Sequence, residues 1–158
     1  MLKIAEDKGL QCYITDALTY LKGKKEESIG GIFSSQVIEH FTPEYLREIV
    51  IESFRVLKNG APIIFETINP LSIFALSRIF FLDITHQKPL HPEYMRYLFE
   101  SSGFFDVEII YSEGDLIDER LEVITPENEI SRVFNTNVDK LNSTLYSSVE
   151  YVVKGIKK

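Results

Sequence analysis

The stretch GIFSSQVIEHFTPEYLREIVIESFRVLKNGAPIIFETINP, residues 31–70, contains the clearest helix signal of the chain, between two apolar segments. Thr42 is placed to cap a helix, and Pro43 follows at the first helical position, where its missing N–H costs no hydrogen bond. Apolar residues then recur at three- and four-residue steps on one face, and Asn59 and Gly60 supply a left-handed stop. The pattern predicts a helix over 43–57 between buried strands over 30–34 and 61–66.

The segments on either side of this unit continue the alternation of strands and helices. Strand patterns occur at 11–15, 104–111 and 149–156, and helical patterns at 17–21, 71–81, from Pro92 to before Gly103, and 127–145. Such alternation is typical of an α/β domain with a largely parallel sheet. The last two strands alternate apolar with polar residues, so we expect them near an edge of the sheet and antiparallel to each other.

The composition is that of one soluble globular domain, which we assign to residues 1–158. The chain has 158 residues, of which 44% are hydrophobic and 26% charged, enough for a single hydrophobic core. With 17 basic against 24 acidic side chains the formal charge is −7, and no basic block occurs, which argues against nucleic-acid binding. The most apolar stretch, residues 71–82, is shorter than the about 20 residues that span a bilayer, so no membrane span is expected.

The compartment is inferred from two further features. The first ten residues lack the apolar block of a signal peptide, and Cys12, as the single cysteine, has no partner for an internal disulfide. We therefore expect a cytoplasmic protein. Because Cys12 falls in the first predicted strand, we expect it to be a buried, unreactive thiol.

Polar side chains follow each of the first three predicted strands, where an open α/β sheet binds its ligands. They are Thr15 and Asp16 after the first strand, Ser34, Ser35, Gln36, Glu39 and His40 after the second, and Glu66, Thr67 and Asn69 after the third. This arrangement predicts a polar pocket along one rim of the sheet. The alternative is that these residues serve only as helix caps and turn formers. Neither a glycine-rich phosphate loop nor a GxSxG nucleophile motif occurs in the sequence.

The three histidines offer a general base or a metal ligand. His40 follows Glu39, and His86 and His91 share a loop with Asp83. Imidazole titrates near neutral pH and a carboxylate such as Asp83 can orient it, which favours a base or a hydrogen-bonding residue for a polar substrate. A metal site of Asp83, His86 and His91 is an alternative whose spacing matches no closed ligand pattern, so no metal is expected. A further alternative is that local caps alone hold this loop.

Residues 31–70 closely resemble the central part of class I S-adenosylmethionine-dependent methyltransferases. The shared pattern is a strand, V-I-E-H with a proline soon after, a helix that ends R-V-L-K-x-G, and a second strand. Residues 81–110, FLDITHQKPLHPEYMRYLFESSGFFDVEII, resemble a subgroup with the pattern Y-x-D-P-T-H-x-x-P-x-H-P that is often associated with methylating sugars of surface polysaccharides. The tail, residues 137–158, is similar to the closing helix and strand of that subgroup. The resemblance covers nearly the whole chain and implies a Rossmann-like α/β sheet, mostly parallel with an antiparallel edge strand.

The resemblance also implies roles for the residues that match the family's motifs. Asp16 and Ala17 match a D-A motif, in which the acid accepts from the adenine amino group and the next backbone N–H meets the ring. Ser34, Ser35 and Gln36 match the segment that contacts the methionine and ribose parts of the cofactor. His40 matches a histidine at the substrate mouth. The substrate-side loop is matched by Asp83, Thr85, His86 and His91, with Ile84 where that loop usually has proline.

One part of the family's pattern has no counterpart in this sequence. A complete member has a first strand with a G-x-G loop and a second strand ending in an acid that holds the ribose, and this chain starts at what resembles the helix after that second strand. We therefore expect an N-terminally truncated domain, the C-terminal two-thirds of the full fold. An open sheet edge follows from this, and such an edge favours homo-oligomers.

The expected function is transfer of a methyl group from S-adenosylmethionine to a sugar hydroxyl or another small polar acceptor. His40 or His86 is the expected base, Asp83 orients that base or binds the acceptor, and Thr85 and His91 contact the acceptor. The alternative is a non-catalytic methyltransferase-like module that binds a partner through the open edge and residues 71–82.

Overall fold

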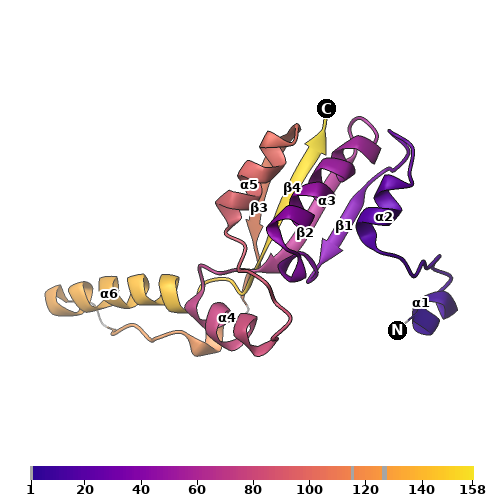
Figure 1. The fold of residues 1–158 in the computed structure, drawn as a ribbon. Coiled ribbons are helices and arrows are strands. Elements are labelled where there is room, and N and C mark those ends of the chain that lie inside the picture. The colour runs from indigo at the N-terminus through magenta and orange to yellow at the C-terminus, as the bar shows by residue number, and fades with distance from the viewer. Residues whose placement is uncertain (1, 115, 126–127) are drawn as a thin grey trace.

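One sheet of four strands, in the order β1-β2-β4-β3, organises the computed structural model, which describes residues 2–114, 116–125 and 128–158 (Figure 1). The strands are β1 (Ile32–Ser35), β2 (Pro62–Ile68), β3 (Phe104–Tyr111) and β4 (Glu150–Lys157). The helices are α1 (Leu2–Asp7), α2 (Ala17–Lys22), α3 (Pro43–Val56), α4 (Ile73–Arg78), α5 (Pro92–Ser101) and α6 (Glu129–Leu145), with short 3₁₀ turns η1 (Ile38–His40), η2 (Phe80–Leu82) and η3 (Ile117–Glu119).

The sheet has the α/β character and mostly parallel direction that the sequence predicts. β1 pairs with β2 in parallel, and β4 runs antiparallel to both β2 and β3, so three of the four strands point the same way. The last two strands are antiparallel to each other, as expected. The antiparallel strand itself is β4, which lies one strand in from the edge that β3 occupies.

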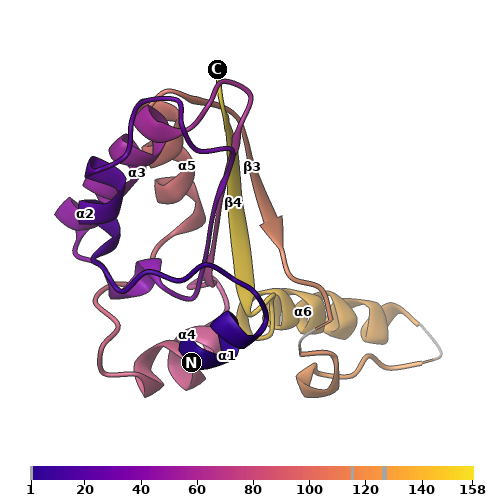
Figure 2. The same cartoon turned by 90° about the vertical axis from the view of Figure 1, so that its right-hand side faces the viewer.

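Helices α2, α3 and α5 cover one face of the sheet (Figure 2). Their apolar side chains form the main core against β2 and β4, in which Leu46, Phe99 and Val153 are fully buried. The rings of Phe65 and Phe99 meet edge to face with centroids 5.5 Å apart. This packing fixes the carboxyl ends of β1 and β2, where the candidate site lies.

The opposite face of the sheet is only half-covered by the residues that the structure describes. The strand register places Phe33, Ile64, Lys154 and Glu108 in one row across the four strands. Phe33 is 66% exposed, whereas Lys154 and Glu108 form an ion pair at 3.3 Å. β1 also has no strand on its outer side within the described chain, so the exposed side chain of Phe33 lies at an unpaired strand edge.

Helix α6 and the segment before it project away from the sheet (Figure 1). The side-chain amide of Asn142 bonds both the N–H and the C=O of Leu121, and that of Asn135 does the same for Ile124. Two amide clamps therefore hold an irregular segment alongside the helix. The predicted helix over 127–145 is confirmed from Glu129 onward, and Glu127 lies outside the described residues.

The helix expected over 43–57 is present as α3, and its cap residue Thr42 accepts from the backbone N–H of Tyr45 at 3.3 Å. Strand β3 matches its predicted range to the residue. The helix expected over 71–81 is divided into α4 and η2. Gly60 adopts a positive φ of 78° as expected, but α3 ends before it, at Val56, and the glycine serves the turn into β2.

The strand expected over residues 11–15 is wrong. This segment is irregular, because no strand of the described chain pairs with it and a short alternating stretch is not stable without a hydrogen-bonded neighbour. Consequently Cys12 is not a buried strand residue: it is half-exposed, and its Sγ donates to the carbonyl of Leu10 at 3.7 Å.

Candidate active site

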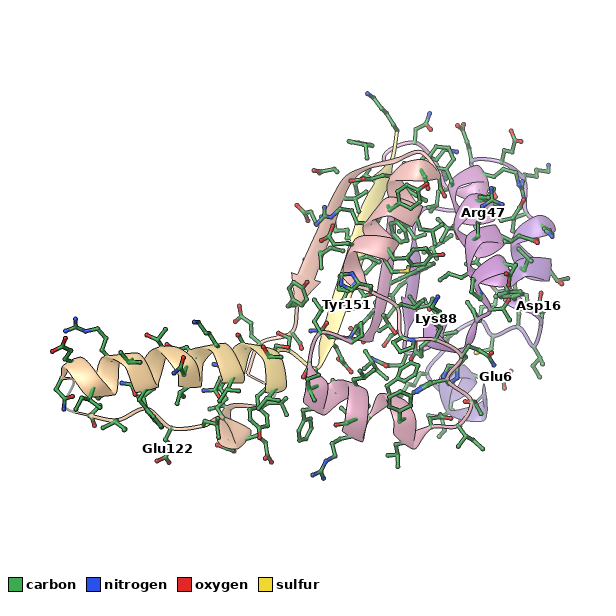
Figure 3. The ribbon with its side chains drawn as sticks, turned by 60° about the vertical axis from the view of Figure 1, so that its left-hand side comes forward. Glu6, Asp16, Arg47, Lys88, Glu122 and Tyr151 are labelled. Carbon is green, nitrogen blue, oxygen red and sulfur yellow. The ribbon has the colours of Figure 1, made fainter. Side chains whose placement is uncertain are left out.

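Asp16 lies directly before α2 at the carboxyl end of the sheet, on the same side as the loop that carries Lys88 (Figure 3). As the cap of α2 it accepts from the backbone N–H of Thr19 at Oδ1, 2.8 Å away. Its Oδ2 accepts from the phenol of Tyr45 at 2.5 Å, and the same phenol oxygen accepts from the N–H of Leu18 at 3.2 Å. The Tyr45 hydroxyl and the Thr19 N–H lower the pKa of Asp16, so this carboxylate is fixed in place and ionised at neutral pH.

A cavity of about 570 Å³ lies beside Asp16, between α2 and the outer side of β1. Its walls are mostly apolar and include Tyr13, Ile32, Phe33, Val37 and Phe41, together with Ala17 and Ser34. Ala17 is the first residue of α2, and the first N–H groups of a helix have no partner within the helix. Thr15 and Ala17 both line the cavity and Asp16 lies between them in the chain, so an apolar cavity with a carboxylate and a helix N–H close by fits a flat, nitrogen-rich ring such as adenine.

Ser35 and Gln36 continue from β1, and their polar groups have partners within the protein. The hydroxyl of Ser35 donates to Glu66 at 2.6 Å, and the amide of Gln36 donates to Glu150 at 2.8 Å. Gln36 has a positive φ of 54°, a left-handed conformation that costs a non-glycine residue about 1 kcal/mol or more. These bonds hold the chain in a sharp change of direction directly after β1.

Glu39 lies in η1, one turn beyond β1, and is 1% exposed. Its Oε2 accepts from the hydroxyl of Thr67 on β2 at 2.8 Å, but its Oε1 has no hydrogen-bond partner among the described residues. A carboxylate oxygen buried without a partner is costly. Neither its burial nor its missing partner is apparent from the sequence, in which Glu39 is simply one polar residue beside His40.

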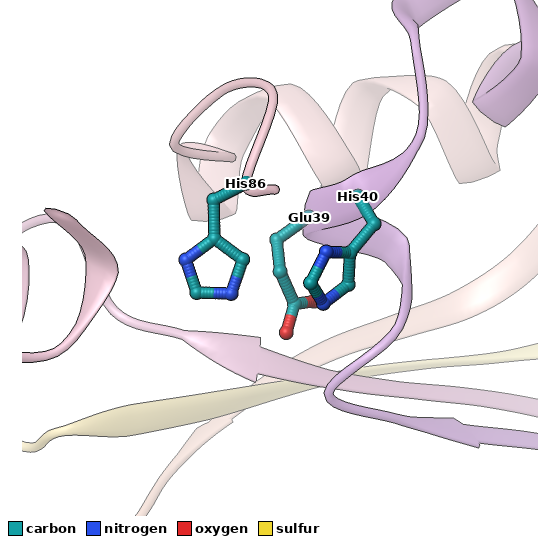
Figure 4. A group of neighbouring side chains, drawn as sticks. All are labelled: Glu39, His40 and His86. Carbon is teal, nitrogen blue, oxygen red and sulfur yellow. The ribbon is translucent and has the colours of Figure 1, made fainter. Parts of the chain in front are cut away.

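Two imidazoles lie next to this carboxylate (Figure 4). The rings of His40 and His86 have centroids 4.6 Å apart, although the two residues are far apart in the chain. The loop that carries His86 is attached to η1, because the N–H of Gln87 donates to the carbonyl of Glu39 at 2.8 Å. The structure therefore pairs His86 with His40 rather than with His91.

His40 and Asp83 are connected through Thr85 rather than in direct contact. The hydroxyl of Thr85 donates to Asp83 Oδ1 at 2.6 Å, and Thr85 Oγ1 lies 2.9 Å from His40 Nδ1. The side-chain and backbone hydrogen bonds from Thr85 lower the pKa of Asp83. One hydroxyl thus connects an ionised carboxylate to the imidazole of His40.

His91 lies at the start of α5, where it caps the helix. Its Nδ1 accepts from the backbone N–H of Glu93 at 3.2 Å, so it caps the helix that Pro92 opens. Together with Phe41, Lys88 and Tyr94 it lines a second, smaller cavity of about 260 Å³ beside the loop. The local-cap interpretation thus describes the hydrogen bond of His91 and the bonds from Thr85 to Asp83, whereas the bond between Thr85 and His40 joins distant segments.

Comparison with known proteins gives matches in solved structures alone: no protein-family model matches the sequence, and no curated protein does. A crystal structure of a SAM-dependent methyltransferase from Archaeoglobus fulgidus is similar with a TM-score of 0.92 and 34% identity, and the match covers 99% of this chain and 72% of that chain. A SAM-dependent methyltransferase from Thermotoga maritima, described as a possible histamine N-methyltransferase, is similar with a TM-score of 0.64 and 19% identity, over 100% of this chain and 69% of that one.

A third similar structure contains ligands. Phosphoethanolamine N-methyltransferase 2 from Haemonchus contortus, in complex with phosphomonomethylethanolamine and S-adenosylhomocysteine, has a TM-score of 0.58 and 15% identity, and the match covers 91% of this chain and 36% of that chain. The two more distant matches support the fold alone. The Archaeoglobus match extends the likeness to the sequence, and together the three confirm the expected fold class.

Proposed function

The chain belongs to the S-adenosylmethionine-dependent methyltransferases, and on that premise we propose that it binds this cofactor beside α2 and transfers the methyl group to a hydroxyl of a sugar or another small polar acceptor. The observation behind the proposal is the presence of two features at one end of the sheet. One is an apolar cavity lined by Thr15 and Ala17, the residues on either side of Asp16, and the other is the imidazole of His40, which is hydrogen-bonded through Thr85 to Asp83.

On the cofactor side, Asp16 accepts from the adenine amino group, and the backbone N–H of Ala17 donates to the ring. The carboxylate of Asp16 is held by Tyr45 and Thr19 and is exposed to solvent, so it is accessible to the ligand. Ser34, Ser35 and Gln36 lie along the methionine and ribose parts, where the hydrogen bonds of Ser35 and Gln36 fix the backbone. When bound, the cofactor supplies an electrophilic methyl group.

On the acceptor side, His40 acts as general base. The proton of Thr85 goes to Asp83, so Thr85 Oγ1 accepts from His40 Nδ1–H, and the neutral ring keeps its lone pair on Nε2. Nε2 would take the proton of the acceptor hydroxyl as that oxygen bonds the methyl carbon. The bond from this carbon to the sulfonium sulfur would break at the same time, with its electron pair left on sulfur, and Asp83 would stabilise the resulting imidazolium. His86 packs against His40 and orients it, and Thr85 and His91 border the acceptor.

A sugar-like acceptor is supported by the resemblance of residues 81–110 to the glycan subgroup and by the exposed polar side chains of Asp83 and Thr85. No helix in the part of the chain that the structure describes has the length and apolarity to cross a membrane.

Calorimetric titration with S-adenosylmethionine tests the cofactor half. Wild-type chain is expected to bind in the micromolar range, and Asp16→Asn, which retains a cap oxygen for Thr19, is expected to bind at least about 10-fold more weakly. Thr42→Ala removes the matching cap of α3 and controls for stability, so it is expected to bind as wild type. Binding unchanged in Asp16→Asn would contradict the assignment of that residue.

No binding at millimolar cofactor would instead favour the second candidate function, a non-catalytic interaction module. The observation behind that candidate is the open outer side of β1 with its exposed Phe33. We propose that this edge pairs copies of the chain into a homo-oligomer, because unpaired strand edges associate. Light scattering is expected to show an oligomer that Phe33→Lys dissociates and Phe105→Lys, on the opposite edge strand, does not. A wild-type monomer would contradict this pairing.

A further inference from the structure

Glu39, His40 and His86 form a cluster whose parts each have an open lone pair directed to a common region (Figure 4). One ligand atom from each of the three lies within 4.8 Å of the other two. Among the described residues, no other group of three His, Cys, Asp or Glu side chains is close enough to hold a metal ion. Figure 4 shows the two rings and the carboxylate converging from η1 and from the loop after η2.

The carboxylate supplies the strongest sign that a ligand belongs here. Glu39 is 1% exposed, and the hydroxyl of Thr67 occupies Oε2, which leaves Oε1 buried and without a partner in the described chain. A buried anion is stable when it is paired or coordinates a metal ion. No lysine or arginine contacts Glu39 in the structure among the described residues.

The hydrogen bonds of both histidines leave Nε2 as the free nitrogen. His86 Nδ1 lies 2.6 Å from the carbonyl of Phe80, and since a carbonyl only accepts, Nδ1 carries the proton. His40 Nδ1 likewise donates to Thr85, whose own proton goes to Asp83. Both neutral rings therefore present an Nε2 lone pair, the form in which imidazole binds metal ions.

The same contacts supply the outer partners that metal-binding histidines usually have. A carboxylate acts on His40 through Thr85, and a backbone carbonyl acts directly on His86. The ring of Phe80 also stacks on His86 with centroids 4.8 Å apart. The orientation of each imidazole is thus set before any ligand binds.

We propose that Glu39, His40 and His86 bind a divalent first-row transition-metal cation such as Zn²⁺ or Mn²⁺. Two imidazoles and one carboxylate are the protein ligands of His₂Glu zinc sites and of related iron sites, which keep one or more positions open. Ligand atoms around a tetrahedral Zn²⁺ lie about 3.4 Å apart, so the three groups, now within 4.8 Å of one another, would move slightly closer on binding. Since both histidines are only half-buried, the remaining positions face the acceptor side of the site.

The metal and the general-base role use the same Nε2 atom of His40. Glu39, His40 and His86 would hold the cation, whose charge would make a hydroxyl bound beside it more acidic, so the base role of His40 applies to the metal-free chain. Metal binding itself requires neither cofactor nor acceptor, so its test is independent of the proposed methyl transfer.

The experiment is calorimetric titration of Zn²⁺ into the full chain without a histidine tag, after chelator treatment and exchange into metal-free buffer. One cation per chain is expected, with affinity lowered at least about 100-fold in Glu39→Gln and in His86→Asn. Glu108→Gln, which alters an exposed carboxylate on β3, is the matched control and is expected to bind as wild type.

Two further measurements keep the result interpretable. Thermal melts with and without Zn²⁺ are expected to show stabilisation of wild type and of Glu108→Gln but not of the two ligand variants. Thr85→Val keeps all three ligands and removes the outer partner of His40, so its affinity for Zn²⁺ is expected to be about 10-fold lower than that of wild type. This variant tests the site independently if a ligand variant fails to fold. The proposal is overturned if wild type takes up no Zn²⁺, or if Glu39→Gln and His86→Asn bind it as tightly as wild type.

Discussion

The cofactor side and the acceptor side of the candidate site differ in how far the protein satisfies its own polar groups. Asp16, Ser35 and Gln36 each have hydrogen-bond partners within the chain. Glu39, in contrast, is almost fully buried with one carboxylate oxygen unpartnered, and it lies against two imidazoles with free Nε2 lone pairs. Ser35 ends β1 and Gln36 follows it directly, and only Val37 and Ile38 lie between this pair and Glu39.

The difference indicates that the two groups of residues have different roles. Groups with internal partners hold the backbone in position, and their contribution appears in stability. Groups left without partners cost stability in the free protein and are retained where a ligand completes them. We therefore expect variants of the partnered groups to lower mainly stability, and variants of the unpartnered groups to lower mainly activity.

The largest effect is expected from His40→Asn, which breaks the acceptor side alone. In metal-free buffer, turnover on an acceptor found by screening is expected to fall about 10²- to 10⁴-fold, because the proton-accepting nitrogen is lost. The affinity for S-adenosylmethionine, measured by calorimetry, is expected to stay within about twofold of wild type. If cofactor affinity fell together with turnover, the two sides would not be separable.

Tyr45→Phe breaks the support of the cofactor side. It leaves the N–H of Leu18 and Oδ2 of Asp16 without their partner, so the protein is expected to lose about 1 kcal/mol of stability. Cofactor affinity is expected to fall about fivefold, since Asp16 is then held by Thr19 alone. Tyr97→Phe, on the exposed side of α5, is the control for removal of a phenol hydroxyl, and an equal effect there would remove the role assigned to Tyr45.

Two variants, one on each side, compare the sides directly through the free energy of unfolding. Ser35→Ala removes the bond to Glu66 and is expected to destabilise the protein by about 1 kcal/mol. Glu39→Gln replaces a buried, half-satisfied anion by a neutral amide that can still bond Thr67, and it is expected to be neutral or stabilising in metal-free buffer. Chemical denaturation measures both, and marked destabilisation by Glu39→Gln would show that the carboxylate is already compensated.

The parts of the fold that the sequence predicts are those with local signals. Helix α3 follows from the cap at Thr42, the proline after it and a regular apolar stripe, all within one segment. Strand β3 follows from strict alternation of apolar and polar residues. The segment over 11–15 has similar alternation and is no strand, because strand formation depends on a neighbour that local sequence does not specify.

The candidate site depends on contacts that no local signal reveals. Asp16 and His40 can be singled out from their positions after predicted strands and from the family resemblance. Tyr45 on α3 and Thr67 on β2, however, act through hydrogen bonds to residues 29 and 28 positions away. The pairing of His40 with His86 likewise depends on the loop after η2 folding back onto η1, and the sequence instead groups His86 with His91.

The smallest effect concerns the pH range over which the hydrogen bond between Tyr45 and Asp16 stabilises the protein. The bond from Tyr45 lowers the pKa of Asp16 from its ordinary 3.8, so that contribution is present above pH 3.8 and is lost as the pH falls through the lower value of the folded state. Burial, and then the bond to Asp16, raise the pKa of Tyr45 above its ordinary 10.0, so that contribution is present below pH 10 and is lost at higher pH. The difference in melting temperature between wild type and Tyr45→Phe is therefore expected to be constant from about pH 5 to 9 and to shrink, by about 1–2 °C, at both ends. Because Asp16 is fully exposed, solvent keeps this effect small, and a difference that changed between pH 5 and 9 would mean that another titrating group controls the carboxylate.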